Sequence, residues 1–198
     1  MLLSRKIILI IASIFIIVFL IVGIGLLAIN EQEPAEIEEI IVEDNLNEQC
    51  ITKTELLEVR GDSLAPLINH GETIKLLHGY YDCARVERED IIAYRHAGND
   101  VPIIKIVKGI QGDKFSLVKS PQSAGWNILI NEAIVKNSEG QPYLIGQAGY
   151  NMLSLFVKDF KGIIPEGAYL ILGNITAGSL DSTSFGLVHK SDFVGKVE

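Results

Sequence analysis

Residues 101–107 read VPIIKIV, an apolar run that carries a single charged residue, Lys105. Short apolar or alternating runs of this kind recur throughout the chain beyond residue 50, and their length suits strands better than helices. Gly, Asn, Asp or Pro separates one run from the next, as expected for turns. The pattern predicts a mostly β domain over 51–198, built as an antiparallel sheet or barrel-like fold. The runs are 72–77, 90–95, 101–107, 114–118, 126–130, 168–172 and 185–188.

The interval 140–162 fits this strand pattern poorly. No long helical period is visible there or elsewhere beyond residue 50, so no long helix is expected in the domain. We interpret 140–162 as an insertion.

Residues 7–29 form an uncharged apolar stretch. As a helix this stretch would be about 35 Å long, enough to cross a hydrocarbon core of about 30 Å. A cleavable signal peptide has an apolar region of only about 7–15 residues. The stretch therefore predicts a retained single-pass transmembrane anchor.

The charges that flank the anchor predict its orientation. Residues 1–6 contain Arg5 and Lys6, whereas residues 30–50 hold acids and no Lys or Arg. Because basic residues stay on the cytoplasmic side, 1–6 is expected in the cytoplasm and 51–198 outside it. We interpret 30–50 as a solvated acidic linker. The net charge of −8 argues against a nucleic-acid partner, which asks for a basic face.

The chain has two cysteines, Cys50 and Cys83. Outside the membrane they could form a disulfide. The sequence does not place them close in space, so two free buried thiols are the alternative. No group of Cys and His has the spacing of a metal site, and none is expected.

Lys105 is the strongest candidate for acid–base chemistry. An ordinary lysine, with a pKa of about 10.4, is well under 1% neutral at pH 8. Burial disfavours the ammonium ion and can lower the pKa by up to about 3–5 units. Large apolar residues on both sides of Lys105 favour such burial. The alternative is a charged residue that protects an edge strand from aggregation, and the pattern alone does not decide between them.

The stretch RGDSLAPLI, residues 60–68, permits two interpretations. Arg60-Gly61-Asp62 is the tripeptide that adhesion proteins present to integrins, which would make this an exposed loop of an interaction domain. Gly61-Asp62-Ser63 followed by an apolar residue and a proline can instead present a serine nucleophile, with Gly61 in a tight turn. A serine needs a base to accept its proton. None of the four histidines stands in a suitable context, so the base would be a lysine.

Two further motifs carry little weight. Ser116 and Lys119 have the Ser-x-x-Lys spacing of penicillin-binding enzymes, which places both side chains on one face of a helix. The run 114–118 is strand-like, and that spacing on a strand points the two side chains to opposite faces. Asn174-Ile175-Thr176 fits a glycosylation sequon, a motif short enough to occur often by chance.

Taken together, these segments resemble the type I signal peptidase family, the membrane-bound serine-lysine proteases that remove signal peptides from exported proteins. The family blocks read roughly Gly-Asp-Ser-Met-x-Pro-Thr-Leu, Gly-Asp-Ile-Val-Val-Phe, Ile-Lys-Arg-Val-Ile-Gly-Leu-Pro-Gly-Asp and Gly-Asp-Asn-x-x-x-Ser-x-Asp-Ser-Arg. Similar segments occur here in the family order and span nearly the whole outer domain. They are 61–68, 90–94, 104–113 and 173–183, with a further strand-and-turn match at 128–132.

The resemblance implies a role for each matching residue. Ser63 would be the nucleophile and Lys105 the general base. Ser179 would hydrogen-bond to the lysine amine and orient it, Asp181 would brace that loop, and Gly61 would form the turn that presents Ser63. The implied partners are the signal peptides of secreted preproteins and the membrane lipid. The resemblance implies no cofactor and no metal, and a monomeric chain. The implied location is the cell membrane, with the catalytic domain extracytoplasmic.

The chain departs from the family blocks in ways that mark a divergent member. Asn174 and Thr183 replace an acid and an arginine of the last block, and losing both together leaves no buried charge unpaired. Archaeal and reticulum-type relatives have His at the position of Lys105, so the bacterial form fits better. In the remaining departures Leu64 replaces Met, Leu67 replaces Thr, Ile106 replaces Arg and Glu89 replaces Gly.

Four alternatives stay open at the level of sequence. One is a pilin-maturation peptidase of conjugation systems, which shares the serine-lysine pair. Another is a self-cleaving repressor, although a repressor carries a DNA-binding segment where this chain has 7–29. The third is a non-catalytic, membrane-tethered interaction domain that uses Arg60-Gly61-Asp62. The fourth is a degenerate family member that has lost activity.

Overall fold

The computed structural model describes residues 50–96, 101–176 and 178–198. All of them belong to the compact unit Asp44–Glu198. The cytoplasmic segment 1–6, the anchor 7–29 and all but the last residue of the linker 30–50 lie outside the described residues. Within the described ranges, no helix combines the length and the apolar character that a membrane crossing requires.

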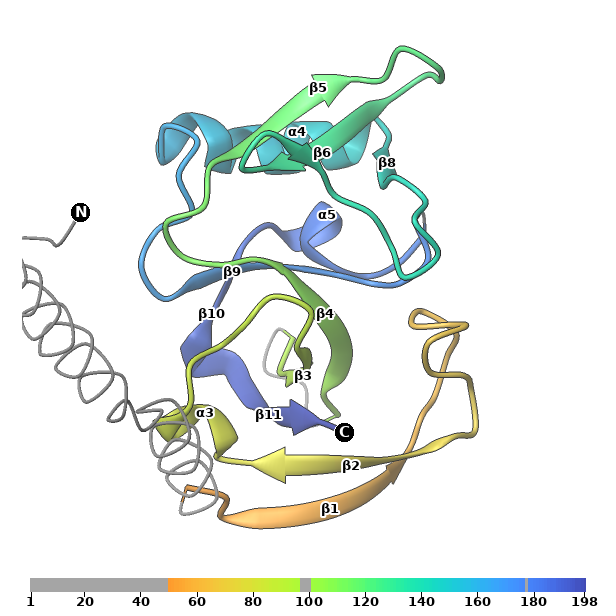
Figure 1. Cartoon of the computed structure of the whole chain (residues 1–198), viewed down its shortest axis with the longest axis vertical. Helices are drawn as coiled ribbons and strands as arrows, with labels where there is room; N and C mark the ends of the chain where they lie inside the picture. Colours follow the sequence, from red (N-terminus) through yellow and green to blue (C-terminus); the bar gives the residue numbers. More distant parts are fainter. Residues whose placement is uncertain (1–49, 97–100, 177) are drawn as a thin grey trace, which may run out of the picture. The chain divides into compact units, whose positions relative to one another are not determined.

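Two antiparallel sheets make up most of the domain (Figure 1). The larger sheet has seven strands in the order β1-β2-β11-β3-β4-β9-β10, and the smaller has β5, β6 and β7 in order, with β8 also paired to β6. The predicted mostly β, antiparallel fold is confirmed. Among the described residues both sheets are open rather than closed into a barrel. The strands are β1 Lys53–Glu58, β2 Thr73–His78, β3 Ile91–Tyr94, β4 Ile103–Gly109, β5 Phe115–Lys119, β6 Trp126–Ile130, β7 Ala133–Ile134, β8 Leu144–Ile145, β9 Ala168–Leu172, β10 Val188–His189 and β11 Phe193–Val197.

Six of the seven predicted runs match strands β2 to β6 and β9. The prediction of a strand over 185–188 was wrong for most of that run. Helix α5, Ser182–Phe185, includes the first residue of the run, and β10 begins only at Val188. Another short helix, α3, spans Tyr80–Cys83, and a 3-10 turn spans Lys190–Asp192.

The expectation of no long helix was also wrong. Helix α4 spans Gln147–Asp159 within the interval interpreted as an insertion. It lies against the small sheet, contacting β5 and β8 (Figure 1). Leu153 on its inner face is fully buried in a core shared with β6 and β9. The interval therefore supplies one wall of a hydrophobic core.

Strand β4 lies inside the large sheet, between β3 and β9. Its residues from Lys105 to Gly109 are all buried, and Ile106 and Val107 enter two different cores on the two faces of the sheet. Burial on both faces explains why the run 101–107 is apolar without alternation. The same position excludes the edge-strand explanation for Lys105.

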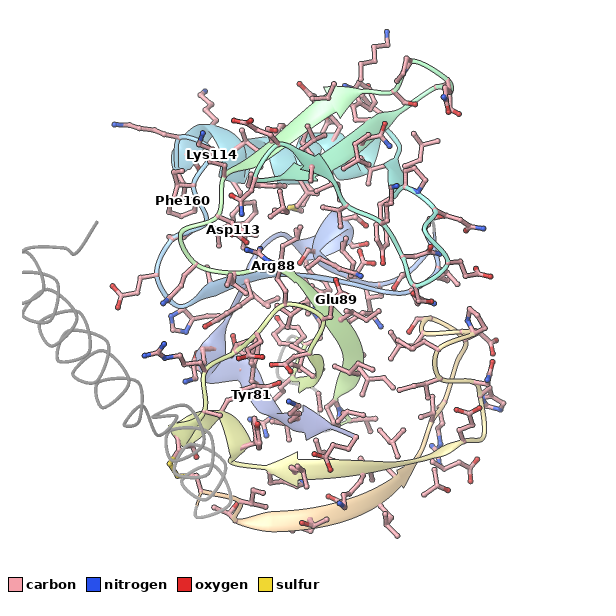
Figure 2. The ribbon with its side chains drawn as sticks, viewed as in Figure 1. Tyr81, Arg88, Glu89, Asp113, Lys114 and Phe160 are labelled. Carbon is pink, nitrogen blue, oxygen red and sulfur yellow. A yellow bond between two sulfur atoms is a disulfide. The ribbon has the colours of Figure 1, made fainter. Side chains whose placement is uncertain are left out.

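The turn after β4 is fixed by a buried carboxylate, Asp113. It accepts hydrogen bonds from the Arg88 guanidinium (Figure 2), from the Ile110 backbone N–H at 2.8 Å and from Asn131 Nδ2 at 2.8 Å. Because three separate segments meet at one carboxylate, the end of the strand that carries Lys105 is held in a defined position.

Cys50 and Cys83 are joined as a disulfide, with their Cα atoms 5.9 Å apart. The bond links the start of the described domain to α3 and settles the question that the sequence left open. It closes a loop between positions 33 residues apart.

Replacing both cysteines with serine is expected to lower the free energy of unfolding by about 3–4 kcal/mol, because the unfolded chain regains the entropy of that loop. Urea unfolding of the full-length chain in mild detergent measures the loss. Reduction of the wild-type chain should give a loss of the same size. A loss below about 1 kcal/mol would contradict the prediction.

Candidate active site

Lys105 lies in the middle of β4 and is 3% exposed. Burial lowers the pKa of its amine to about 8, even though the nearby Asp181 carboxylate acts in the opposite direction. Desolvation outweighs attraction here because the amine has lost nearly all of its water. At mildly alkaline pH a large share of Lys105 is therefore uncharged and able to accept a proton.

Ser63 lies within reach of this amine. Lys105 Nζ donates hydrogen bonds to Ser63 Oγ at 2.9 Å and to the Ile104 carbonyl at 2.7 Å. A neutral amine has two N–H donors and one lone pair. With one N–H held by Ile104, the amine can turn its lone pair toward the Ser63 hydroxyl, which is the geometry that proton transfer requires.

Gly61 begins the loop that carries Ser63, here called the Ser63 loop and defined as residues 61–68. Its φ of 95° lies in the left-handed region that favours glycine. Its backbone N–H donates to His70 Nδ1 at 3.1 Å. This N–H therefore already has an acceptor and is not free to donate to a bound substrate.

The exposed Arg60-Gly61-Asp62 tripeptide satisfies one condition of the adhesion interpretation. That interpretation also requires an ordinary lysine at position 105. The buried, pKa-shifted Lys105 beside Ser63 does not meet this condition. The competing Ser116 and Lys119 are both exposed on β5, and their predicted strand conformation is confirmed.

The segment that follows β9 holds the back of the Ser63 loop. The Ser63 carbonyl accepts the backbone N–H of Asn174 at 2.7 Å and that of Ile175 at 3.3 Å. A Cβ at Gly173 would lie 2.8 Å from the same carbonyl, so the two segments can approach this closely only with glycine at position 173. Sequence reasoning gave Gly173 no role, because the constraint exists only in the folded chain.

Asp181 is buried and accepts three hydrogen bonds. Gly173 N–H donates at 3.0 Å, Thr183 N–H at 3.0 Å and Thr183 Oγ1 at 2.7 Å. These contacts tie the start of α5 back to the end of β9, which is the kind of contact that the predicted bracing role needs. Asn174 and Thr183 are the two residues that depart from the last family block. They hydrogen-bond to different partners and not to each other.

Ser179 lies against Gly173. It does not make the hydrogen bond to Lys105 that its predicted orienting role requires. Its buried Oγ has no hydrogen-bond partner among the described residues. The hydroxyl therefore retains its capacity to bond, and the orienting role stays a prediction. The adjacent sequon is not available for modification, because Asn174 is fully buried and its side-chain amide is hydrogen-bonded.

Glu89 stands where the family block has glycine, and its φ of 68° explains that preference. Its carboxylate, visible near β4 in Figure 2, accepts a 2.7 Å hydrogen bond from Lys108. Lys108 is only 4% exposed. The exposed Glu89 carboxylate thus pairs with Lys108, a buried lysine of β4. Lys105, the other buried lysine of β4, has no direct carboxylate contact among the described residues.

Comparisons with known proteins find similarity to bacterial signal peptidases. The signal peptidase IB of Staphylococcus aureus strain COL is 28% identical over 152 residues, which cover 70% of this chain and 73% of that protein. The signal peptidase I of Bacillus caldolyticus is 27% identical over 149 residues, covering 71% of this chain and 75% of that protein. The crystal structure of a signal peptidase I from Enterococcus faecalis V583 aligns with a TM-score of 0.42 and 21% identity, over 58% of this chain and 98% of that one.

The model of one protein family matches almost the entire chain. That family is described as signal peptidase, peptidase S26, and the match spans residues 3–198. The chain therefore belongs to the signal peptidase family, peptidase S26, and is a serine peptidase.

Proposed function

We propose that this chain cleaves N-terminal signal peptides from secreted preproteins, with Ser63 as nucleophile and Lys105 as general base. The observation that carries the assignment is the 2.9 Å contact between Ser63 Oγ and the Nζ of a buried lysine. A serine hydroxyl becomes an effective nucleophile only when a positioned base accepts its proton. No cofactor or metal is needed for this chemistry.

The reaction proceeds in two steps. Ser63 Oγ attacks the scissile carbonyl while Lys105 Nζ accepts the hydroxyl proton and then delivers it to the leaving amine. The Ser63 backbone N–H, which donates to no other described residue, stabilises the oxyanion; one such donor is typically worth about 3–4 kcal/mol. In the second step Lys105 deprotonates a water, which hydrolyses the ester and releases the signal peptide.

The surroundings of the two residues give each supporting residue a role. Gly61 provides the turn before Ser63, and Asp181 fixes the loop that packs beside Lys105. Ser179, whose buried hydroxyl has no other hydrogen-bond partner among the described residues, orients the lysine amine during the reaction. In the membrane, 7–29 would form the anchor, with 1–6 in the cytoplasm. The acidic linker 30–50 would connect the anchor to the peptidase domain 51–198 at the outer face of the cell membrane. The enzyme would act as a monomer.

The rate of cleavage is expected to follow the protonation of Lys105. Because the pKa of Lys105 is about 8, kcat/KM should rise with pH, by about 50-fold between pH 6 and pH 8, and level off above pH 9. The sign follows from the need for the neutral amine. Steady-state cleavage of a peptide substrate across this range measures the profile. A flat profile, or a midpoint above pH 10, would contradict an uncharged lysine as the base.

The proposed function is tested by incubating the full-length chain in mild detergent with a preprotein that carries an Ala-x-Ala site. The expected result is a single cut directly after that site, identified by N-terminal sequencing of the product. A pilin precursor is included as the comparison. Preferential cleavage of the pilin precursor would replace the proposal with the pilin-maturation function, and cleavage of neither would assign the chain to the degenerate members.

A further inference from the structure

Asn174 is the most completely buried polar side chain near the Ser63 loop, with 0% of its surface exposed. Its Nδ2 donates to the Ala65 carbonyl at 3.0 Å, across 109 residues of sequence. Its backbone N–H donates to the Ser63 carbonyl at 2.7 Å. One residue therefore holds the Ser63 loop at two points, on either side of Leu64.

The other side of Asn174 is attached to the turn after β7. Ser138 N–H donates to Asn174 Oδ1 at 2.9 Å, and Asn174 Nδ2 donates its second hydrogen to Ser138 Oγ at 2.8 Å. The Asn174 carbonyl accepts Asn137 Nδ2 at 3.1 Å. All donors of the amide are used, and the N–H of Ser138 fixes which end of the amide is oxygen.

An amide satisfies this set of partners, whereas an ionised carboxylate does not. Ala65 offers a carbonyl, which needs a donor, while Ser138 N–H needs an acceptor. A carboxylate at position 174 would accept from Ser138 but would place a buried negative charge 3.0 Å from the Ala65 oxygen. A buried acceptor that faces another acceptor is unfavourable, because neither has water to replace the missing donor.

We infer that Asn174 is a positioning residue for the peptidase reaction, which holds the Ser63 loop so that Ser63 Oγ stays within reach of Lys105 Nζ. The inference rests on the proposed function of Ser63 and Lys105. Because Asn174 is fully buried behind the loop, its amide acts on the alignment of the nucleophile and does not bind the substrate. Its loss therefore lowers kcat and leaves KM within about twofold.

The test is Asn174→Asp in the full-length chain, with kcat and KM for a signal-peptide substrate measured from pH 5.5 to pH 9. When protonated, the introduced carboxyl can donate to the Ala65 carbonyl, and when ionised it cannot. The ratio of variant to wild-type kcat should therefore fall as pH rises, reaching about a 10- to 100-fold loss at pH 8. This dependence is opposite in sign to the rise of the wild-type rate.

Asn127→Asp is the matched control. Asn127 is also buried and its Nδ2 donates to the Tyr143 carbonyl at 3.1 Å, but it lies on β6 and bonds to no residue of the Ser63 loop. This control should lose stability and keep a pH-independent kcat ratio. If Asn174→Asp gives the same constant ratio as the control, the inference is wrong.

A second variant decides the question if Asn174→Asp does not fold. Ser138→Ala removes one acceptor of the Asn174 amide from an exposed turn, and it should lower kcat about two- to fivefold at unchanged KM. An unchanged kcat in Ser138→Ala would overturn the inference. A wild-type chain that cleaves no preprotein would instead refute the proposed function, so the two failures are distinguishable.

Discussion

Replacing Lys105 with Met is expected to lower the rate of preprotein cleavage by about 10⁴-fold, because Ser63 loses the proposed base that lies within hydrogen-bonding reach of its hydroxyl. The same change should raise the free energy of unfolding at pH 7 by about 1–3 kcal/mol. Below its pKa of about 8 the amine is charged, buried and 3% exposed. Methionine has a similar length and removes that buried charge.

The stabilisation has a defined dependence on pH. The pKa of Lys105 is lower in the folded chain, at about 8, than its ordinary value of 10.5. Between these values the unfolded chain binds the additional proton, so the wild-type stability rises with pH through this window. The advantage of the methionine variant is therefore greatest below pH 8 and shrinks as pH approaches 10.5. Urea unfolding at pH 7 and pH 10 measures the difference.

Lys108→Met provides the matched control, because Lys108 lies on the same strand and is equally buried. Its amine is paired with Glu89 at 2.7 Å, so the wild-type charge is already compensated. Cleavage should stay within about threefold of wild type, and stability at pH 7 should not increase. Equal loss of cleavage in both variants would mean that β4 needs its lysines for folding rather than for catalysis.

Much of the fold was predictable because strand signals are local. β-Branched runs bounded by Gly, Asn or Asp gave β2 to β6 and β9. β1 was missed because Lys53–Glu58 is half charged and forms an edge strand, where burial imposes little pattern. β11 was missed because Gly195 interrupts its short run. A side chain there would collide with the Leu77 backbone, so the glycine reflects a close approach of β2 and not a turn.

Helix α4 shows where a signal was present and was not recognised. Its inward side chains, Tyr150, Leu153 and Val157, follow the three- and four-residue spacing of an amphipathic helix. Gly149 and Asn151 weaken the helical propensity of the segment, and Gly146 provides no side-chain cap at the N-terminus. The helix is held by tertiary packing on the small sheet, which propensity does not report.

The candidate site divides in the same way. Ser63 and Lys105 could be proposed as the catalytic pair from the sequence because each lies in a distinctive local context, namely a glycine turn and an apolar strand. The contacts of Asn174 with Ala65 and Ser138 span 109 and 36 residues, and Cys50 meets Cys83 across 33. The order of the strands in the sheets brings such partners together. Their residue types alone do not show that they are partners.

Ser63→Ala is expected to reduce preprotein cleavage by about 10⁴- to 10⁶-fold. The change removes the hydroxyl oxygen that lies 2.9 Å from Lys105 Nζ and leaves the backbone contacts of the Ser63 carbonyl with Asn174 and Ile175 intact. Ser63 is partly exposed, so the free energy of unfolding should change by less than about 1 kcal/mol. Cleavage assays and urea unfolding on one preparation test both statements.

Ser116→Ala is the control for this experiment, because Ser116 belongs to the competing Ser-x-x-Lys motif. Its side chain is exposed on β5, in the small sheet rather than the large sheet that carries Lys105. Cleavage by this variant should equal that of wild type within about twofold. Wild-type cleavage by Ser63→Ala, or its loss in Ser116→Ala, would move the nucleophile away from the Ser63 loop. It would also remove the reason for a neutral lysine at position 105, since a buried amine with no hydroxyl to activate would only destabilise β4.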